Sequence, residues 1–175
     1  ALAGQTILGD LFNYFVIFFD RPFKIGDFII IDENMGVVNR IGIKTTRIKS
    51  LDGEEIILSN TDLTKSRIHN YKKMITRRVA FTFGLTYQTK VDELKVIPDI
   101  IKKIIESNDN VEFDRAHFCD FGDSSLKFEV VYYINNPEYN KYRDIQQNIN
   151  LEIMQEFEKR GIEVAYPTRT LFMAK

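Results

Sequence analysis

The stretch RPFKIGD, residues 21–27, lies where the hydrophobic pattern of the chain changes. Pro22 lacks a backbone N–H and would end a helix that reaches it, while the ring of Phe23 can anchor the following turn in a core. Gly26 permits a tight turn, and the carboxylate of Asp27 can accept hydrogen bonds from neighbouring backbone amides. We therefore expect a helix before this stretch and a different kind of fold after it.

Residues 1–20 form an apolar segment without lysine or arginine, whose charged residues are Asp10 and Asp20. As a helix it would extend about 28 Å, close to the thickness of a bilayer core. Asp10, Gln5 and Asn13 argue against a span that faces lipid by itself. Small residues, which would let the helix pack among copies of itself, are Ala1, Ala3, Gly4 and Gly9. The alternative is a buried amphipathic helix of a soluble protein, or an oligomerisation helix.

Short β-type runs separated by turn residues follow this segment. Asp52 and Gly53 form a strong hairpin dipeptide, and Gly36 follows a polar turn. Four or five short strands with tight turns predict a small barrel or sandwich. The expected strands are residues 27–31, 36–41, 45–49 and 55–58.

The second half of the chain has the order strand, helix, strand, strand, helix, strand, which is the split βαβ pattern of ferredoxin-like domains. We expect the first helix to open with Thr89 as its capping residue and to be kinked or started by Pro98. The second helix should open at Asn136 and Pro137 and end at Gly161. The expected strands are residues 79–84, 112–120, 126–134 and 170–173. The predicted fold class is α+β.

The composition excludes several classes of protein. The formal net charge is -1 and the sequence pI is about 6.2, which disfavours binding to nucleic acid through bulk charge. A single cysteine excludes a disulfide within the chain. The sequence contains no phosphate-binding glycine loop, paired-cysteine zinc motif or nucleophile elbow. We therefore predict no enzyme and no cofactor.

His117 and Cys119 are the tightest candidates for chemistry, because side chains two positions apart share one face of a strand. With Asp114 and Asp120 nearby, they could form a thiol beside a base or a weak metal site. The spacing supplies no orienting third group and no closed set of ligands. A strand at the edge of a core is the favoured interpretation.

Residues 65–78 carry six basic side chains and no acidic one. Such a surface would concentrate anions or contact phosphates. An ordinary solvated face is the alternative interpretation. The basic residues are Lys65, Arg67, Lys72, Lys73, Arg77 and Arg78.

Arg21, Pro22 and Phe23, followed after two variable positions by Gly26 and Asp27, resemble a motif of the small-conductance mechanosensitive channel (MscS) family. The resemblance covers the whole chain and is most specific in its first seventy residues. It continues in order through Gly36, Val37, Ile41, Thr45 or Thr46, Arg47, Ile48, Asp52, Gly53, Ile56, Ile57, Asn60, Ile68 and Asn70.

Two positions depart from the family pattern. Ser59 stands where the family usually has a proline, which loses a rigid φ but keeps the turn-forming Asn60 after it. Asn13 and Tyr14 stand where the pore helix often has a small residue or glycine. A hinge at that point is therefore not carried over.

The resemblance implies a pore-type helix, an Sm-like β-barrel domain, a ferredoxin-like α/β domain and a C-terminal strand that joins a barrel made by all subunits. These parts would be residues 1–20, 21–72, 73–166 and 167–175. Leu2 aligns approximately with a position that narrows the closed pore by an apolar constriction. The family implies a homo-oligomer, usually a heptamer, in the inner membrane. Preceding transmembrane helices would contact lipid, and this portion would be mostly cytoplasmic.

The leading hypothesis is the vestibule and pore-helix end of a tension-gated channel that releases ions and small osmolytes on hypo-osmotic shock. Lys65, Arg67, Lys72 and Lys73 would raise the local anion concentration in the vestibule. An Sm-like RNA-binding ring is the alternative from another class, although the net charge argues against nucleic acid as a partner. A soluble oligomeric scaffold is the third hypothesis.

Overall fold

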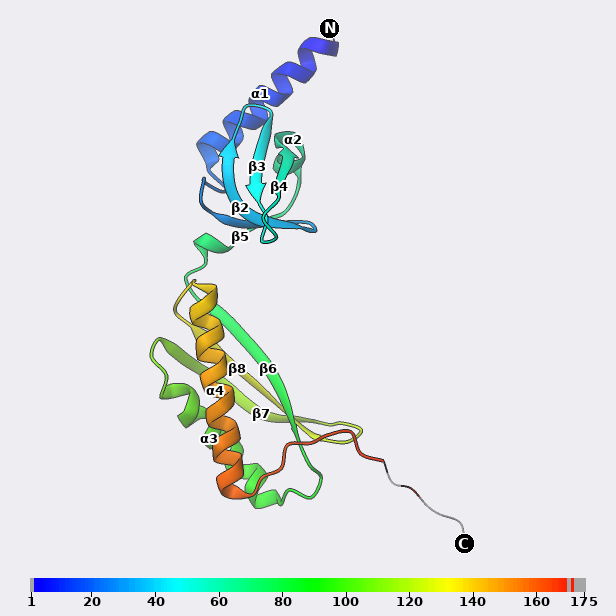
Figure 1. Cartoon of the computed structure of the whole chain (residues 1–175), viewed down its shortest axis with the longest axis vertical. Coiled ribbons are helices and arrows are strands. Elements are labelled where there is room, and N and C mark those ends of the chain that lie inside the picture. Colours follow the sequence, from blue (N-terminus) through cyan, green and yellow to red (C-terminus); the bar gives the residue numbers. More distant parts are fainter. Residues whose placement is uncertain (1, 170, 172–175) are drawn as a thin grey trace. The chain divides into compact units, whose positions relative to one another are not determined.

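The computed structural model describes residues 2–169 and residue 171, apart from the side chains of residues 2–6. The chain forms two compact units, Ala1–Met74 and Ile75–Lys175 (Figure 1). Each unit contains one antiparallel sheet and a hydrophobic core of its own. The predicted α+β class is confirmed.

The first unit consists of an apolar helix and a five-stranded sheet in the order β4-β3-β2-β1-β5. Its elements are α1 (Leu2–Asp20), β1 (Phe28–Ile31), β2 (Asn34–Ile41), β3 (Thr45–Lys49), β4 (Glu55–Ser59), α2 (Asn60–Lys65), β5 (Ile68–Asn70) and a 3₁₀ turn, η1 (Tyr71–Lys73). The first four strands lie where the pattern predicts them. Helix α2 and strand β5 are not predicted, because six and three residues are too few to show a period.

One face of this sheet forms the core of the first unit. Buried and more exposed residues alternate along β1 and β3, as expected for strands with one solvated face. Both helices contribute to the same core. Its buried members are Ile17, Phe23, Ile29, Ile31, Val38, Ile48 and Leu63.

Two glycines of the sheet meet different constraints. Gly36 on β2 lies so close to β3 that a Cβ atom would overlap the carbonyl oxygen of Lys49. Gly53, in the turn between β3 and β4, has a φ of +99°, which is a left-handed conformation. The neighbouring Asp52 is exposed in this turn, and its backbone N–H donates to the Ser50 hydroxyl at 3.1 Å.

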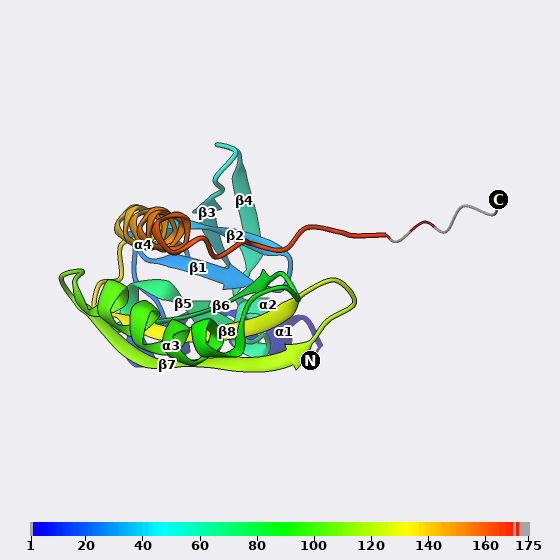
Figure 2. The ribbon, with the colours of Figure 1, turned by 90° about the horizontal axis from the view of Figure 1, so that it is seen from below.

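The second unit packs two helices against a three-stranded sheet in the order β6-β8-β7 (Figure 1 and Figure 2). Its elements are β6 (Arg77–Leu85), α3 (Val91–Glu106), β7 (Val111–Phe121), β8 (Leu126–Ile134) and α4 (Tyr139–Arg160). Its core includes Val79, Ile97, Ile101, Ile105, Phe128, Val130, Tyr132, Ile149, Ile153 and Phe157. Alternate residues of β8 belong to this core, so both helices cover the same face of the sheet.

The segment after α4 returns to the sheet beside β6. Gly161 ends the helix with a φ of +66°, as predicted. The backbone N–H of Ala165 donates to the Gly84 carbonyl at 2.8 Å, and that of Thr86 donates to the Glu163 carbonyl at 3.1 Å. The predicted strand at 170–173 lies outside the described residues, apart from Leu171, which is not in a strand.

The helix starts in the second unit differ from the predictions. Helix α3 begins after Lys90, not Thr89, because the carboxylate of Glu93 accepts a hydrogen bond from the Lys90 backbone N–H at 3.2 Å. The helix continues through Pro98, which therefore does not mark its start. Helix α4 begins after Glu138, because the side chain of Asn136 first forms a local turn with the Glu138 N–H at 2.8 Å.

Replacing Gly36 by alanine should destabilise the first unit. The added methyl group overlaps backbone of β3, which cannot rotate away, so we expect a loss of about 1–3 kcal/mol in the free energy of unfolding. Denaturant unfolding followed by circular dichroism measures it. Gly9→Ala is the matched control, because no atom beyond the local backbone of α1 lies within 4 Å of its Cβ position. It should raise helix stability by up to about 1 kcal/mol, and equal effects of the two changes would contradict the prediction.

Candidate functional site

Helix α1 ends in a left-handed residue immediately before Pro22. Arg21 has a φ of 47°, and its backbone N–H donates to the carbonyl of Ile17 at 3.1 Å. Its guanidinium Nε donates to the carbonyl of Phe18 at 3.4 Å. A left-handed residue that bonds back to the last turn closes a helix, and proline after it prevents continuation. The helix therefore stops one residue earlier than a break at proline alone requires.

The turn after Pro22 is seated on the sheet. Phe23 is 1% exposed and belongs to the core of the first unit. Gly26 has a φ of +90°, and its N–H donates to the carbonyl of Val38 on β2 at 2.8 Å. The N–H of Val38 in turn donates to the carbonyl of Asp27 at 2.9 Å. These bonds fix the direction in which α1 leaves the sheet.

Asn70 ties this turn to the last strand of the unit. Its amide Nδ2 donates to the carboxylate of the buried Asp27 at 2.8 Å and to the carbonyl of Pro22 at 3.0 Å. The same carboxylate accepts from the Lys24 backbone N–H at 2.9 Å. We call Pro22, Asp27 and Asn70 the junction cluster. It closes the turn against a residue 48 positions away from Pro22 in the sequence.

A second set of polar contacts holds the middle of α1 against α2. Asn13 donates to the Thr61 hydroxyl at 2.9 Å and accepts from the Thr64 hydroxyl at 2.9 Å. The Thr61 hydroxyl donates to the carboxylate of Asp10 at 3.3 Å, and that carboxylate also pairs with Lys44 at 3.5 Å. We call these five residues the α1–α2 latch. The latch accounts for two of the three polar interruptions in the apolar helix.

The sequence patterns described above do not predict a role for Thr61, Thr64 or Lys44. A usable signal was present, because Asp10 and Asn13 on α1 are three positions apart, as are Thr61 and Thr64 on α2. Residues at this spacing lie on one face of a helix. The polar face of α1 and that of α2 have the same length, so a contact between the two helices could have been predicted from their spacing.

Asn60 supports the latch from within the unit. Its buried amide donates to the carbonyls of Gly42 at 2.8 Å and Ile43 at 3.0 Å, and accepts from the hydroxyl of Thr46 at 2.8 Å. Its backbone N–H donates to the carbonyl of Lys44 at 3.0 Å. One residue therefore fixes both the start of α2 and the loop that carries Lys44.

The outer surface of α1 is apolar and exposed. No helix in the described part of the chain combines the length and hydropathy that crossing a membrane requires. Leu2 lies in the first turn of α1, in the part whose side chains are not described. Between residues 7 and 20 of α1, the exposed large apolar residues are Ile7, Leu8, Leu11, Phe12, Phe15, Val16, Phe18 and Phe19. A patch of this kind marks a surface for association.

The basic residues singled out in the first unit are all exposed. Lys65 ends α2, Arg67 precedes β5, and Lys72 and Lys73 lie in η1. The Nζ of Lys73 donates to the carbonyl of Arg21 at 3.0 Å, so this residue also contacts the end of α1.

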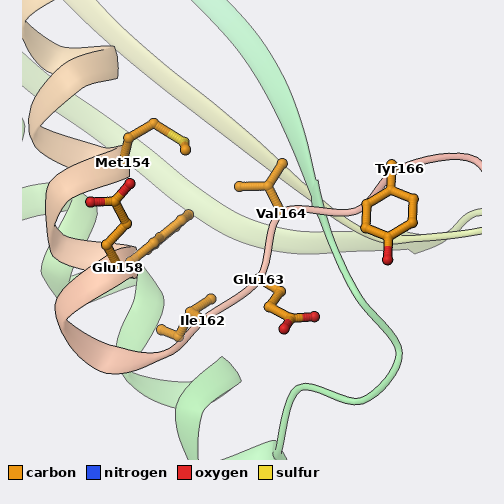
Figure 3. Close-up of a pocket in the computed structure, with 7 residues that line it drawn as sticks. Met154, Glu158, Ile162, Glu163, Val164 and Tyr166 are labelled. Carbon is orange, nitrogen blue, oxygen red and sulfur yellow. The ribbon is translucent and has the colours of Figure 1, made fainter.

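In the second unit, the residues between 75 and 169 form no comparable set of polar contacts around a candidate residue. His117 and Cys119 are exposed, and the thiol donates to the Lys127 carbonyl at 3.3 Å. Among the described residues, no group of three histidine, cysteine or acidic side chains is arranged to hold a metal ion. A shallow groove of about 320 Å³ lies between α4 and the segment after it (Figure 3). Its lining residues are Met154, Phe157, Glu158, Ile162, Glu163, Val164 and Tyr166.

Two family models match the chain in order. The model described as "Mechanosensitive ion channel, beta-domain" matches residues 6–73. The model described as "Mechanosensitive ion channel MscS, C-terminal" matches residues 79–164. Between them they include the latch, the junction cluster and most of the second unit.

Curated relatives are similar along the whole chain. The large-conductance mechanosensitive channel MscMJLR of Methanocaldococcus jannaschii is 38% identical over 180 residues, covering 100% of this chain and 50% of that protein. The low conductance mechanosensitive channel YnaI of Escherichia coli is 29% identical, covering 98% of this chain and 51% of that protein. The chain thus spans about half the length of the relatives it matches.

Solved structures have the same fold. Arabidopsis thaliana MSL1 A320V superposes with a TM-score of 0.86 at 22% identity, over 95% of this chain and 64% of that one. Helicobacter pylori MscS in its closed state gives a TM-score of 0.79 at 22% identity, over 100% of this chain and 68% of that one.

These relatives are ion channels and not enzymes, and they give no support to an RNA-binding ring. Because both units match the family in order and the curated relatives are similar from end to end, the chain belongs to the MscS family of mechanosensitive ion channels.

Proposed function

We propose that this chain is the pore-helix end and vestibule of a tension-gated channel that releases ions and small osmolytes on hypo-osmotic shock. The observation that carries the proposal is α1, an apolar helix with a broad exposed face that polar contacts hold in one position on a folded unit. An exposed apolar face is covered when helices of several copies pack together. The working assembly is therefore a homo-oligomer, which we propose to be a heptamer.

The proposed channel lies in the inner membrane, with the two folded units in the cytoplasm. Transmembrane helices of the complete protein would contact lipid and carry tension to α1. Leu2 is our candidate for an apolar constriction, since a narrow apolar ring stops ions by excluding water. Tension favours whichever state occupies the larger area in the membrane, so gating requires only two states that differ in the position of α1.

We also propose finer descriptions of the two units. The five-stranded sheet, with the short α2 between β4 and β5, supports an Sm-like barrel. The order β6-β8-β7, with helices after β6 and β8 and an isolated bridge from Leu85 to Val164, supports a ferredoxin-like domain. The terminal residues 167–175 would supply one strand of a barrel shared among subunits.

The complete protein that contains this chain should conduct when its membrane is stretched. Patch recordings from liposomes that contain only the purified protein should show currents that appear with suction and vanish on its release. Native mass should give one ring-sized oligomer without absorbance from nucleic acid. Liposomes without protein are the control. A pure, correctly assembled oligomer that stays silent up to the rupture tension would overturn the proposal.

The junction cluster should stabilise the first unit. Asn70→Ala leaves the carbonyl of Pro22 without this donor and leaves the buried Asp27 carboxylate with the Lys24 N–H and without the amide of Asn70, which should cost about 1–3 kcal/mol in the free energy of unfolding. Denaturant titration of the chain measures it. Asn148→Ala, at an exposed position of α4, is the control and should leave stability unchanged or slightly higher. Equal losses in both variants would show that the cluster contributes nothing specific.

The basic residues should favour anions in the vestibule. Replacing Lys65, Arg67 and Lys72 by glutamate should lower the permeability ratio of chloride to potassium. An opening lined by charges of one sign raises the local concentration of ions of the opposite sign. Lys73 is left unchanged because it contacts the end of α1. Reversal potentials in a salt gradient across the complete channel give the ratio. Glutamine at the same three positions should give an intermediate ratio, and an unchanged ratio in both sets would exclude this role.

A further inference from the structure

The α1–α2 latch combines neutral hydrogen bonds with one ion pair. The bonds between Asn13 and the two threonines join uncharged groups. The ion pair joins the Asp10 carboxylate to the Nζ of Lys44 at 3.5 Å. The Lys44 side chain is 75% exposed and that of Asp10 is 19% exposed, so solvent ions reach the pair from the lysine side.

An exposed ion pair responds to salt, whereas a neutral hydrogen bond hardly does. The Debye length falls from about 10 Å at 0.1 M to about 3 Å at 1 M ionic strength. For two unit charges at this separation in water, the change from about 0.1 M to about 0.5 M weakens the pairing equilibrium roughly 1.5- to 2-fold. If all copies move together, the factors of the copies multiply.

The charged partner is held in place by the fold. The backbone of the loop that carries Lys44 is fixed by Asn60, which bonds to the carbonyls of residues 42, 43 and 44. The Asp10 carboxylate is also fixed, because it accepts from the Thr61 hydroxyl at 3.3 Å. Salt therefore acts on the Lys44 side chain and its attraction to Asp10 and leaves the loop in place.

We propose that the Asp10–Lys44 pair makes opening of the channel depend on the ionic strength of the solution around the first unit. This inference rests on the proposed function. High ionic strength weakens the latch and lowers the tension at which α1 leaves its docked position. When ions leave through the open channel and the salt concentration around the unit falls, the pair strengthens and favours the return of α1. The pair would thus favour closure after ions have been released.

The test is the tension midpoint of the complete channel in excised patches, with the solution at the first unit switched between about 0.1 M and about 0.5 M KCl. Sucrose keeps the osmolarity constant. The wild type should open at lower tension in the higher salt. Asp10→Asn removes the charge and keeps an oxygen for Thr61, and Lys44→Gln removes the other charge at an exposed position where folding is not at risk. Both variants should lose the salt-dependent shift.

Two controls separate the pair from general effects of salt on the membrane. Glu55→Gln breaks another exposed ion pair of the same sheet, with Arg47 at 2.9 Å, and should keep the full shift. The double variant Asp10→Lys with Lys44→Asp should regain the salt-dependent shift of the tension midpoint. A full shift in Asp10→Asn and Lys44→Gln, or its loss in Glu55→Gln, would overturn the inference while leaving the proposed function intact. A wild type without tension-activated current would instead overturn the proposed function.

Discussion

The buried carboxylate of Asp27 is the constraint on which the first unit depends. A buried carboxylate costs free energy unless donors reach its oxygens, and here the donors come from two directions. Lys24 supplies a local backbone N–H, whereas Asn70 supplies an amide from the last strand of the sheet. The local turn therefore has its full set of donors only when β5 is in place. The direction in which α1 leaves the unit is consequently a property of the whole sheet and not of the turn alone.

Asn60 and Asn70 stabilise the contacts of α1 at two positions along the helix. Each uses a short amide side chain to hold backbone carbonyls that lie far away in the sequence. Asn70 fixes the end of the helix, and Asn60 fixes the platform of α2 and the loop of Lys44 that the middle of the helix contacts. A helix held at two points along its length keeps both its direction and its rotation about its own axis. The exposed apolar face of α1 is therefore presented in one orientation.

Local chemistry made the turns predictable, and distance in sequence made their partners unpredictable. Gly26, Gly53 and Gly161 were identified because a positive φ leaves a signature in a single residue. The contacts of Asn70 with Pro22 and of Thr64 with Asn13 join residues 48 and 51 positions apart, and no period or turn rule reports them. Helix starts in the second unit differ from the predictions by one to three residues, because several neighbouring polar residues there can form local hydrogen bonds and the residue types alone do not decide between them. Short elements such as α2 contain too few residues to show a hydrophobic period, so the sequence does not predict them.

The apolar and polar surfaces of α1 make contacts of different physical character. Apolar contact is not directional and scales with buried area, so a helix can shift along an apolar partner with little change in free energy. A hydrogen bond is lost when its donor and acceptor move apart by about 1 Å or less. For a helix in the position of α1, the apolar face therefore determines that it associates, and the polar contacts with Thr61, Thr64 and Lys44 determine where it stops. These contacts, together with the buried Ile17 and the junction cluster at the end of the helix, therefore define one docked position of α1.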